Sequence, residues 1–246
     1  MDELEITEKK VWEEINNKTS SHISERWLGD AYSTNLSKDL RTLISGRLGQ
    51  QGELGWPIIK KLIHNYGHQE ELLMAAGLCY QKEARDYLIS LFRSQEKPNI
   101  AIVKALNCWG ASLTIKDLKK IVQDKSTEMR LAGINLISFK SHLLNELEIL
   151  ELVEDLIYDF REEIVINVIR LLQRRDEELI VNCLTKATNN KNYRIFKTAI
   201  IALGAIGTKY SSLQLSNIEQ GLTSNVHKEF IRKQLSHQYR KSCDLN

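Results

Sequence analysis

The stretch of this 246-residue chain whose residue types most suggest chemistry is SGRLGQQGELGWP, from Ser45 to Pro57. Glycines at positions 46, 49, 52 and 55 would suit a loop whose backbone amides hold phosphate. A P-loop, however, needs a lysine and a serine or threonine after its last glycine, and here Trp56 and Pro57 follow. A dinucleotide loop needs a G-x-G opening, and collagen needs many proline-rich triplets. We therefore predict that the glycines separate two helices, because glycine ends helices and proline fits a first helical turn.

The sequence gives little evidence for a metal site or for reactive or paired cysteines. His64 and His68 are four residues apart, which could place two ligands on one helix face, but Gly67 lies between them and no third ligand accompanies them. We predict no metal site. The four cysteines, at positions 79, 108, 183 and 243, are widely spaced without a C-x-x-C pair. We expect no disulfide framework, and three of these cysteines to behave as small hydrophobic residues. No catalytic residue is predicted.

The bulk composition is that of an ordinary folded chain, with 42% hydrophobic and 27% charged residues. No apolar run approaches the roughly 18 residues that cross a bilayer, so no membrane association is expected. The amino-terminal MDELEITEKKVWEE is acidic and lacks the basic-then-apolar order of a signal peptide. A cytoplasmic location is the default expectation.

Charge is unevenly distributed, although the net charge is only +2. Residues 146–163 carry eight acidic side chains against one arginine, and HKEFIRKQLSHQYRK near the carboxyl end carries five basic residues against Glu229. A charged run is most often a solvated face, but such asymmetry also suits contact with a charged partner. We predict that a protein partner with an acidic surface binds the basic residues of this tail. They are Lys228, Arg232, Lys233, Arg240 and Lys241.

The pattern of apolar residues predicts an almost wholly helical protein. Only two prolines occur, and apolar residues recur at three- and four-residue intervals. The segment ELEILELVEDLIYDF is typical of this pattern. Its apolar face is predicted to hold Ile149, Leu152, Val153, Leu156 and Phe160. Its polar face is predicted to hold Glu148, Glu151, Asp155 and Asp159.

Internal repetition indicates the architecture. Six hexamers resemble one another, namely ISGRLG, AAGLCY, ALNCWG, INLISF, VIRLLQ and ALGAIG, which begin at residues 44, 75, 105, 134, 168 and 202. Each is followed by a second amphipathic segment. The spacing predicts an all-α, right-handed α-solenoid of about six helical pairs, in which each pair buries its apolar face against its neighbours. Ala105 and Ala202, at the first hexamer position, are predicted to be buried between adjacent helices.

Three regions follow from this repetition. Residues 1–40 are predicted to form an amino-terminal helical cap, because terminal repeats need a polar outer face. Residues 41–222 form the repeats. Residues 223–246 form a basic capping helix and tail, in which Phe230, Ile231, Leu235 and Tyr239 are spaced to dock on the sixth pair.

The segment YRIFKTAIIALGAIG, which ends at Gly207, carries an A-L-G-x-x-G signature that resembles HEAT repeats. More narrowly, it looks like the short HEAT-like repeats of the phycobilisome lyase family, over roughly residues 40–222. That family repeats an Asp followed by an Arg, which this chain offers only as Asp124 with Arg130 and, with Asn replacing Asp, as Asn192 with Arg194. The second and fifth hexamers also end in Tyr80 and Gln173 instead of glycine.

The resemblance implies proteins that bind phycobiliproteins, of which some attach, isomerise or remove linear tetrapyrroles and others are scaffolds. A lyase or lyase subunit would join a thiol of the phycobiliprotein to the pigment, a C–S bond-forming reaction, mainly by holding the pigment in position. Aromatic faces would suit the pigment rings, and Arg or Lys its propionates. Core packing is favoured over this role for Trp109 and is equally plausible for Trp56. The candidate residues are Trp56, Tyr66, Tyr80, Arg85, Lys104 and Trp109.

Two other function classes remain open. A non-enzymatic scaffold that cradles a protein partner, either a phycobiliprotein subunit or a second lyase-like chain, fits any α-solenoid. Nucleic-acid binding would require a basic stripe along the groove. Because the middle of the chain is acidic and only its tail is basic, nucleic-acid binding ranks last.

Overall fold

A computed structural model describes residues 3–17 and 23–243, and within these ranges every regular element is a helix. The chain divides into two compact units, Met1–Leu113 and Thr114–Asn246. Six helical pairs follow one another along the chain, from α3–α4 to α13–α14. The prediction of an all-α solenoid of about six pairs is confirmed.

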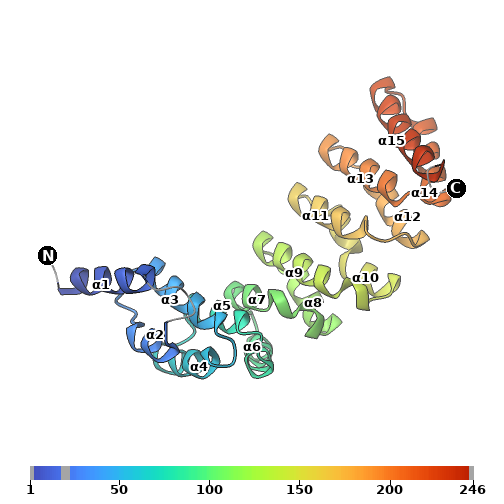
Figure 1. Cartoon of the computed structure of the whole chain (residues 1–246). Coiled ribbons are helices and arrows are strands. Elements are labelled where there is room, and N and C mark those ends of the chain that lie inside the picture. Colours follow the sequence, from blue (N-terminus) through green and yellow to red (C-terminus); the bar gives the residue numbers. More distant parts are fainter. Residues whose placement is uncertain (1–2, 18–22, 244–246) are drawn as a thin grey trace. The chain divides into compact units, whose positions relative to one another are not determined.

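The first unit stacks its helices in two layers (Figure 1). The helices α3, α5 and α7 pack side by side, α4 packs on α3 and α5, and α6 packs on α5 and α7. The elements of this unit are α1 (Glu3–Asn17), α2 (Glu25–Ala31), α3 (Lys38–Gln50), α4 (Gly55–Tyr66), α5 (Glu70–Leu78), α6 (Lys82–Ser94), α7 (Ile100–Ala105) and the 3₁₀ helix η2 (Asn107–Ser112).

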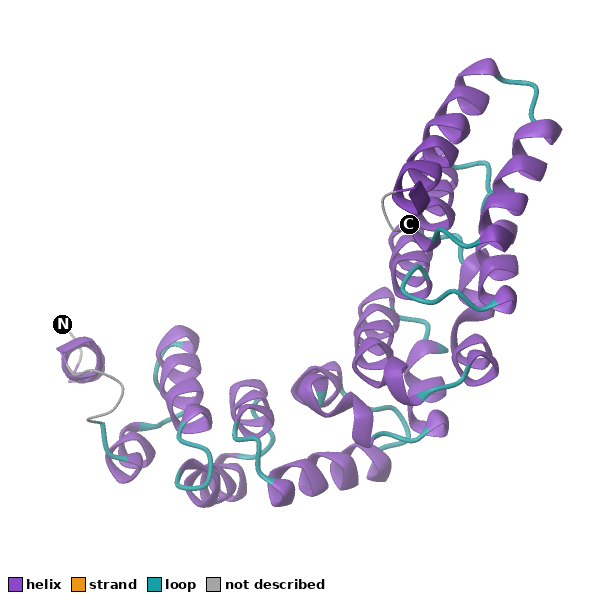
Figure 2. Ribbon diagram, turned by 45° about the vertical axis from the view of Figure 1, so that its right-hand side comes forward, coloured by secondary structure: helices purple, strands orange, loops and turns teal. Residues whose placement is uncertain are grey.

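The second unit repeats this arrangement, with α9, α11, α13 and α15 side by side in one layer and α8, α10, α12 and α14 in the other (Figure 2). Its elements are α8 (Ile115–Val122), α9 (Thr127–Lys140), η3 (Ser141–Leu143), α10 (Glu146–Val153), η4 (Glu154–Tyr158), α11 (Glu162–Leu172), α12 (Glu178–Ala187), α13 (Tyr193–Ile206), α14 (Lys209–Gly221) and α15 (Asn225–Cys243).

Side-chain caps set the beginning of several helices. The hydroxyl of Thr114 accepts from the backbone N–H of Asp117, whose carboxylate accepts from the N–H of Thr114, which forms a capping box at α8. Asn145 and Glu148 form the same box at α10. The helices α8 and α10 therefore begin where the local sequence offers a capping residue. Both caps lie in the polar stretches that separate the predicted helical segments.

The glycines predicted to separate two helices do so only in part, because Gly46 and Gly49 lie within α3 and Gly52 lies between α3 and α4. A Cβ atom on Gly49 would lie 2.8 Å from the carbonyl oxygen of Ala75, so its absence lets α3 and α5 approach closely. Gly52 has a φ of +59°, which glycine adopts at little cost. Gly55 begins α4, and a Cβ there would lie 1.9 Å from the carbonyl oxygen of Leu48. Gly46 has open space beside it.

The predicted repeat register is wrong in the fourth pair. The other five hexamers begin with two consecutive buried residues, as at Ala202 and Leu203. In INLISF the second residue, Asn135, is exposed, whereas Leu136 and Ile137 are fully buried. The hexamer of this repeat therefore begins at residue 136. The sequence alone offered Ile134 as an equally apolar start, and only packing against the neighbouring helices distinguishes the two. Ala105 and Ala202 are buried as predicted.

The apolar face predicted for ELEILELVEDLIYDF is correct only in part. Ile149, Leu152, Val153 and Leu156 are buried, but Phe160 is 91% exposed and the Asp159 side chain, predicted to lie on the polar face, is 2% exposed. The reason is that α10 ends at Val153 and continues as the 3₁₀ helix η4. A tighter helix has a different residue period, so the α-helical pattern no longer applies beyond it.

Candidate functional site

The α9–α11 groove is a hollow of about 350 Å³ on the surface where these two neighbouring helices meet. Buried Ile134 and Leu171 give it an apolar floor, and polar side chains surround that floor. The residues that line it are Leu131, Ile134, Asn135, Ser138, Glu163, Asn167, Arg170, Leu171 and Arg174.

Two asparagines stand at equivalent positions of successive repeats in this groove. Asn135 directly precedes Leu136 in α9, and Asn167 directly precedes Val168 in α11, so each precedes the buried pair of its repeat. The side-chain amide of Asn167 donates to the carbonyl oxygen of Glu163 at 2.8 Å. A carboxamide has two N–H donors and a carbonyl acceptor, so this bond leaves Asn167 able both to donate and to accept.

The charge of the α9–α11 groove comes mainly from α11. Arg170 and Arg174 are exposed, and Glu163 supplies one carboxylate. The groove is therefore suited to a ligand with a polar backbone and some negative charge. These groove residues were not among the candidates from the sequence. The sequence does carry a signal, because Asn135 and Asn167 each lie within a short apolar run and are 32 positions apart. The fourth hexamer was placed two residues too early, so the two asparagines were not recognised as equivalent.

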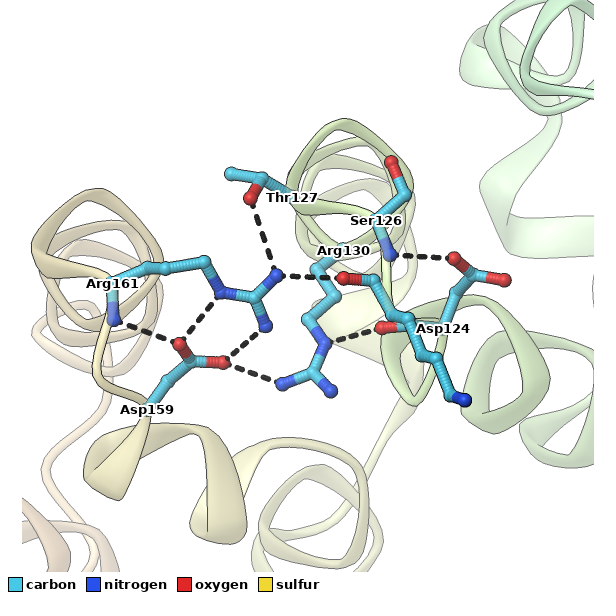
Figure 3. Close-up of polar contacts among 7 residues, drawn as sticks. Asp124, Ser126, Thr127, Arg130, Asp159 and Arg161 are labelled. Carbon is cyan, nitrogen blue, oxygen red and sulfur yellow. Dashed lines mark hydrogen bonds and ion pairs between the residues drawn. The ribbon is translucent and has the colours of Figure 1, made fainter.

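An ion-pair network centred on the buried carboxylate of Asp159 and two partly exposed arginines joins the two helices that form the groove (Figure 3). Arg130 of α9 contacts the backbone oxygen of Asp124 and the carboxylate of Asp159. Arg161 donates to Asp159 at 2.8 Å, to the backbone oxygen of Lys125 at 2.9 Å and to the hydroxyl of Thr127 at 3.2 Å. The hydrogen bonds from Arg161 lower the pKa of Asp159 to about 2, and the charge of Arg130 acts in the same direction.

The two Asp/Asn–Arg pairs noted in the sequence thus have structural roles. Asp124 accepts from the backbone N–H of Ser126, the N-cap of α9, at 2.7 Å. Asn192, the N-cap of α13, and Arg194 both donate to Glu162 of the preceding repeat, at 2.7 and 2.6 Å. Each pair connects one repeat to the next, and this network fixes the walls of the α9–α11 groove.

Three of the six residues predicted to bind a ligand lie together in the first unit. The ring centroids of Tyr80 and Trp109 are 6.0 Å apart, and the guanidinium carbon of Arg85 lies 5.7 Å from the Trp109 ring. Tyr80 is 61% exposed and has a φ of +53°, a left-handed conformation that is uncommon for a bulky residue. Beside this cluster is a hollow of about 810 Å³, lined by Arg85, Asp86, Ile89, Ser90, Arg93, Ser94 and Ser112.

The other three predicted ligand-binding residues do not join this cluster. Trp56 is buried and donates to Glu83 at 3.2 Å, which is a packing role. Tyr66 donates to the carbonyl oxygen of Tyr32 at 3.4 Å, in a separate hollow of about 430 Å³ between α2 and α4. Lys104 lies on α7 and is half-buried.

The predicted partner-binding cations lie on α15. Lys233 is exposed and Lys228 is half-buried. Arg232 is exposed but donates to Glu219 of α14 at 2.6 Å, so part of its charge is already paired within the chain. The side chains of Arg240 and Lys241 lie outside the described part of the protein.

Thiol and metal chemistry find no site in the described residues. Burial raises the pKa of both the Cys79 and the Cys183 thiol to about 12, so neither forms a thiolate readily. Within the described ranges no group of His, Cys, Asp and Glu side chains could hold a metal ion. His68 instead contacts the hydroxyl of Tyr87 at 2.9 Å. No helix of the described chain has the length and apolarity needed to cross a membrane.

No protein-family model and no curated protein matches the chain. Solved structures similar to it include human deoxyhypusine hydroxylase in complex with glycerol, at 15% identity and a TM-score of 0.43, covering 96% of this chain and 98% of the other. A designed armadillo repeat protein shows 15% identity and a TM-score of 0.42, covering 88% and 100%. Another designed armadillo repeat protein, in complex with the peptide (KR)4, shows 15% identity and a TM-score of 0.40, covering 87% and 98%.

Proposed function

We propose that this protein is a helical-repeat scaffold that binds an extended segment of a partner protein along the α9–α11 groove. The observation that carries the proposal is the pair of asparagines at equivalent positions of two successive repeats, above an apolar floor. Partner binding by a scaffold needs no catalytic group, and the residue types in the groove form no nucleophile with a neighbouring base.

The chemistry of the groove suits a peptide main chain. An extended segment carries one N–H and one C=O per residue that no partner in its own chain satisfies. A carboxamide offers both kinds of partner, and Asn167 keeps a donor and an acceptor beyond its bond to Glu163. Apolar side chains of the segment would contact Ile134 and Leu171, and its acidic side chains would be attracted by Arg170 and Arg174.

A displayed library of random linear peptides, selected on the immobilised full chain, tests this function. Each selected peptide is then labelled with a fluorophore, and its affinity is measured by anisotropy for the parent and for the double variant Asn135→Ala/Asn167→Ala. We expect the double variant to bind at least about tenfold more weakly, which corresponds to roughly 1.4 kcal/mol. The matched control is Asn189→Ala/Asn217→Ala, which removes two exposed amides outside the groove. Peptides that bind parent and double variant equally, or a selection that yields no binder, would contradict the proposal.

A second candidate is positioning of a linear tetrapyrrole, as in a phycobilin lyase or lyase subunit. The observation that favours it is the cluster of Tyr80, Arg85 and Trp109, which combines two aromatic rings with a guanidinium. Such a cluster could hold a planar pigment by its rings and by one propionate.

Co-expression with the pigment and phycobiliprotein subunits distinguishes the two candidates. A lyase yields a coloured covalent adduct with the subunit, and the variant Arg85→Ser should weaken the colour while leaving the chain folded. Trp109 is left unchanged because its ring N–H donates to the carbonyl oxygen of Gly77 at 3.3 Å. A stable but colourless complex favours the scaffold. The groove variant Asn135→Ala/Asn167→Ala is the control for pigment positioning, because its residues are separate from the aromatic cluster.

A further inference from the structure

The last helix of the row α9, α11, α13 and α15 has one face packed and one face open. Its packed face is fixed on α13 and α14, where Ile231 is fully buried. Gln238 donates to the carbonyl oxygens of Leu203 and Gly204, both at 3.0 Å. Within this row α11 and α13 each contact a row neighbour on both sides, whereas the main helix contacts of α15 are with α13 and α14.

The open face of α15 contains an apolar hollow of about 640 Å³. Val226 is 69% exposed and Tyr193 is 49% exposed, so the hollow presents apolar surface to solvent. We name it the α13–α15 end face. The residues that line it are Tyr193, Val226, Glu229, Phe230, Arg232, Lys233 and Ser236.

Ring contacts hold the end face in a defined shape. The His227 ring stacks on Tyr193, with centroids 5.3 Å apart and planes at 16°, and lies 4.9 Å from the ring of Phe196. The ammonium of Lys197 lies 5.6 Å from the centre of the Phe230 ring. Because α13 and α15 are joined through these rings, the hollow is formed before any partner arrives, which reduces the entropy lost on binding.

The charge around the end face is mainly positive. Lys197, Arg232 and Lys233 are exposed cations, and Glu229 is the acidic residue among those that line the hollow. Arg232 bonds Glu219 yet stays 67% exposed, so its remaining N–H groups can reach a ligand. A partner with carboxylates beside an apolar anchor would complement this surface.

We propose that the α13–α15 end face docks an acidic amphipathic helix of a partner protein. A helix fits because the open face continues a row in which each helix packs beside the next. Its apolar side chains would enter the hollow beside Tyr193, Val226 and Phe230, and its carboxylates would meet Lys197, Arg232 and Lys233. This site is separate from the α9–α11 groove and does not depend on the function proposed for it.

A second copy of this chain is the less suitable occupant. Its own acidic helix α10 has its apolar face, formed by Ile149, Leu152 and Val153, buried within the fold. Leu147 is the exposed apolar side chain of that helix, so the helix could present carboxylates and one leucine to another copy but not a continuous apolar face. Dimer formation through the end face is therefore measured separately, by sedimentation velocity.

The test uses the full chain and three helix-stapled peptides of about 18 residues, or roughly five turns. The first carries leucines along one face and glutamates elsewhere. The second replaces each glutamate with lysine, and the third replaces each leucine with serine. We expect the first peptide to bind, as measured by fluorescence anisotropy, at least about tenfold more tightly than either of the others. Its affinity should fall as salt concentration rises, because exposed charges are screened.

Two variants and a matched control locate the binding. Val226→Glu and Lys233→Glu alter exposed residues and should weaken binding of the first peptide at least about tenfold while circular dichroism and the melting temperature stay unchanged. Leu213→Glu adds the same charge at an exposed leucine of α14, outside the end face, and should bind as the parent does. The groove variant Asn135→Ala/Asn167→Ala should also bind normally.

Three results would overturn the proposal. The first is that no stapled peptide binds the parent. The second is that acidic and basic peptides bind equally, or that Val226→Glu has no effect. The third is that the parent forms a dimer in sedimentation velocity which Val226→Glu abolishes, because the end face would then be occupied by a second copy.

Discussion

Arg130 of α9 and Asp159, which follows η4, form an ion pair across successive repeats, with the Asp159 side chain 2% exposed. Arg161 approaches the same carboxylate from the beginning of α11. A carboxylate removed from water is stable only when its charge and lone pairs are matched, and here two guanidinium groups match them. This network therefore sets how α9 and α11 meet and so positions the α9–α11 groove.

The variant Asp159→Asn should be strongly destabilising. It leaves two guanidinium groups without their shared anion, and loss of one partner from a buried ion pair typically costs about 3 kcal/mol or more. Urea unfolding followed by circular dichroism measures the change. Asp155→Asn alters an exposed carboxylate in the preceding 3₁₀ helix η4; it is the control and should stay within about 0.5 kcal/mol of the parent. Equal unfolding midpoints for the two variants would show that the network contributes little.

Stability should fall in acid. The pKa of Asp159 is about 2 in the folded chain, below the roughly 3.9 of an unfolded aspartate. Its contribution is therefore fully present above pH 4 and is lost as the pH falls from about 4 to about 2, by roughly 2 kcal/mol. Glu162 and Glu177 also have lowered pKa values, chiefly through hydrogen bonds from Asn192 and Arg175, and act in the same direction. Unfolding free energies across this range should drop less in Asp159→Asn than in the parent.

Two glycines of α3 should respond oppositely to alanine. A Cβ on Gly49 would lie 2.8 Å from the carbonyl oxygen of Ala75, so Gly49→Ala should force α3 and α5 apart and cost about 1–3 kcal/mol. Gly46 has nothing within 4 Å of such an atom, so Gly46→Ala should gain about 0.5–1 kcal/mol through helix propensity. Melting temperatures that move in the same direction would contradict the close approach of the two helices.

Ala202 should not tolerate a charge. It is fully buried in α13, where Ala202→Glu would place a carboxylate without a partner and cost several kcal/mol. Ala205→Glu, three residues later in the same helix and exposed, should leave the melting temperature almost unchanged. If Ala202→Glu melted as the parent does, the repeat register of the sixth pair would be wrong.

The sequence by itself determined the helical pairs and the approximate repeat. Apolar spacing along one helix is a local property, because residues three and four apart share a face whatever the helix packs against. Ala105 and Ala202 were therefore identified correctly as buried. The glycines from position 46 to 55 were predicted to separate two helices, and this is correct only in part, because Gly52 lies between α3 and α4 whereas Gly46 and Gly49 lie within α3.

Tertiary structure decided the features that depend on contacts between residues about one repeat apart. Whether Ile134 or Leu136 begins the fourth hexamer depends on which pair of residues the neighbouring helices cover. The change from α10 to η4 leaves Phe160 in solvent and turns Asp159 toward two arginines. Asn135 and Asn167 become one site only because α9 and α11 lie side by side. Their spacing is present in the sequence, but the packing of one helix on the next decides which side chains remain at the surface.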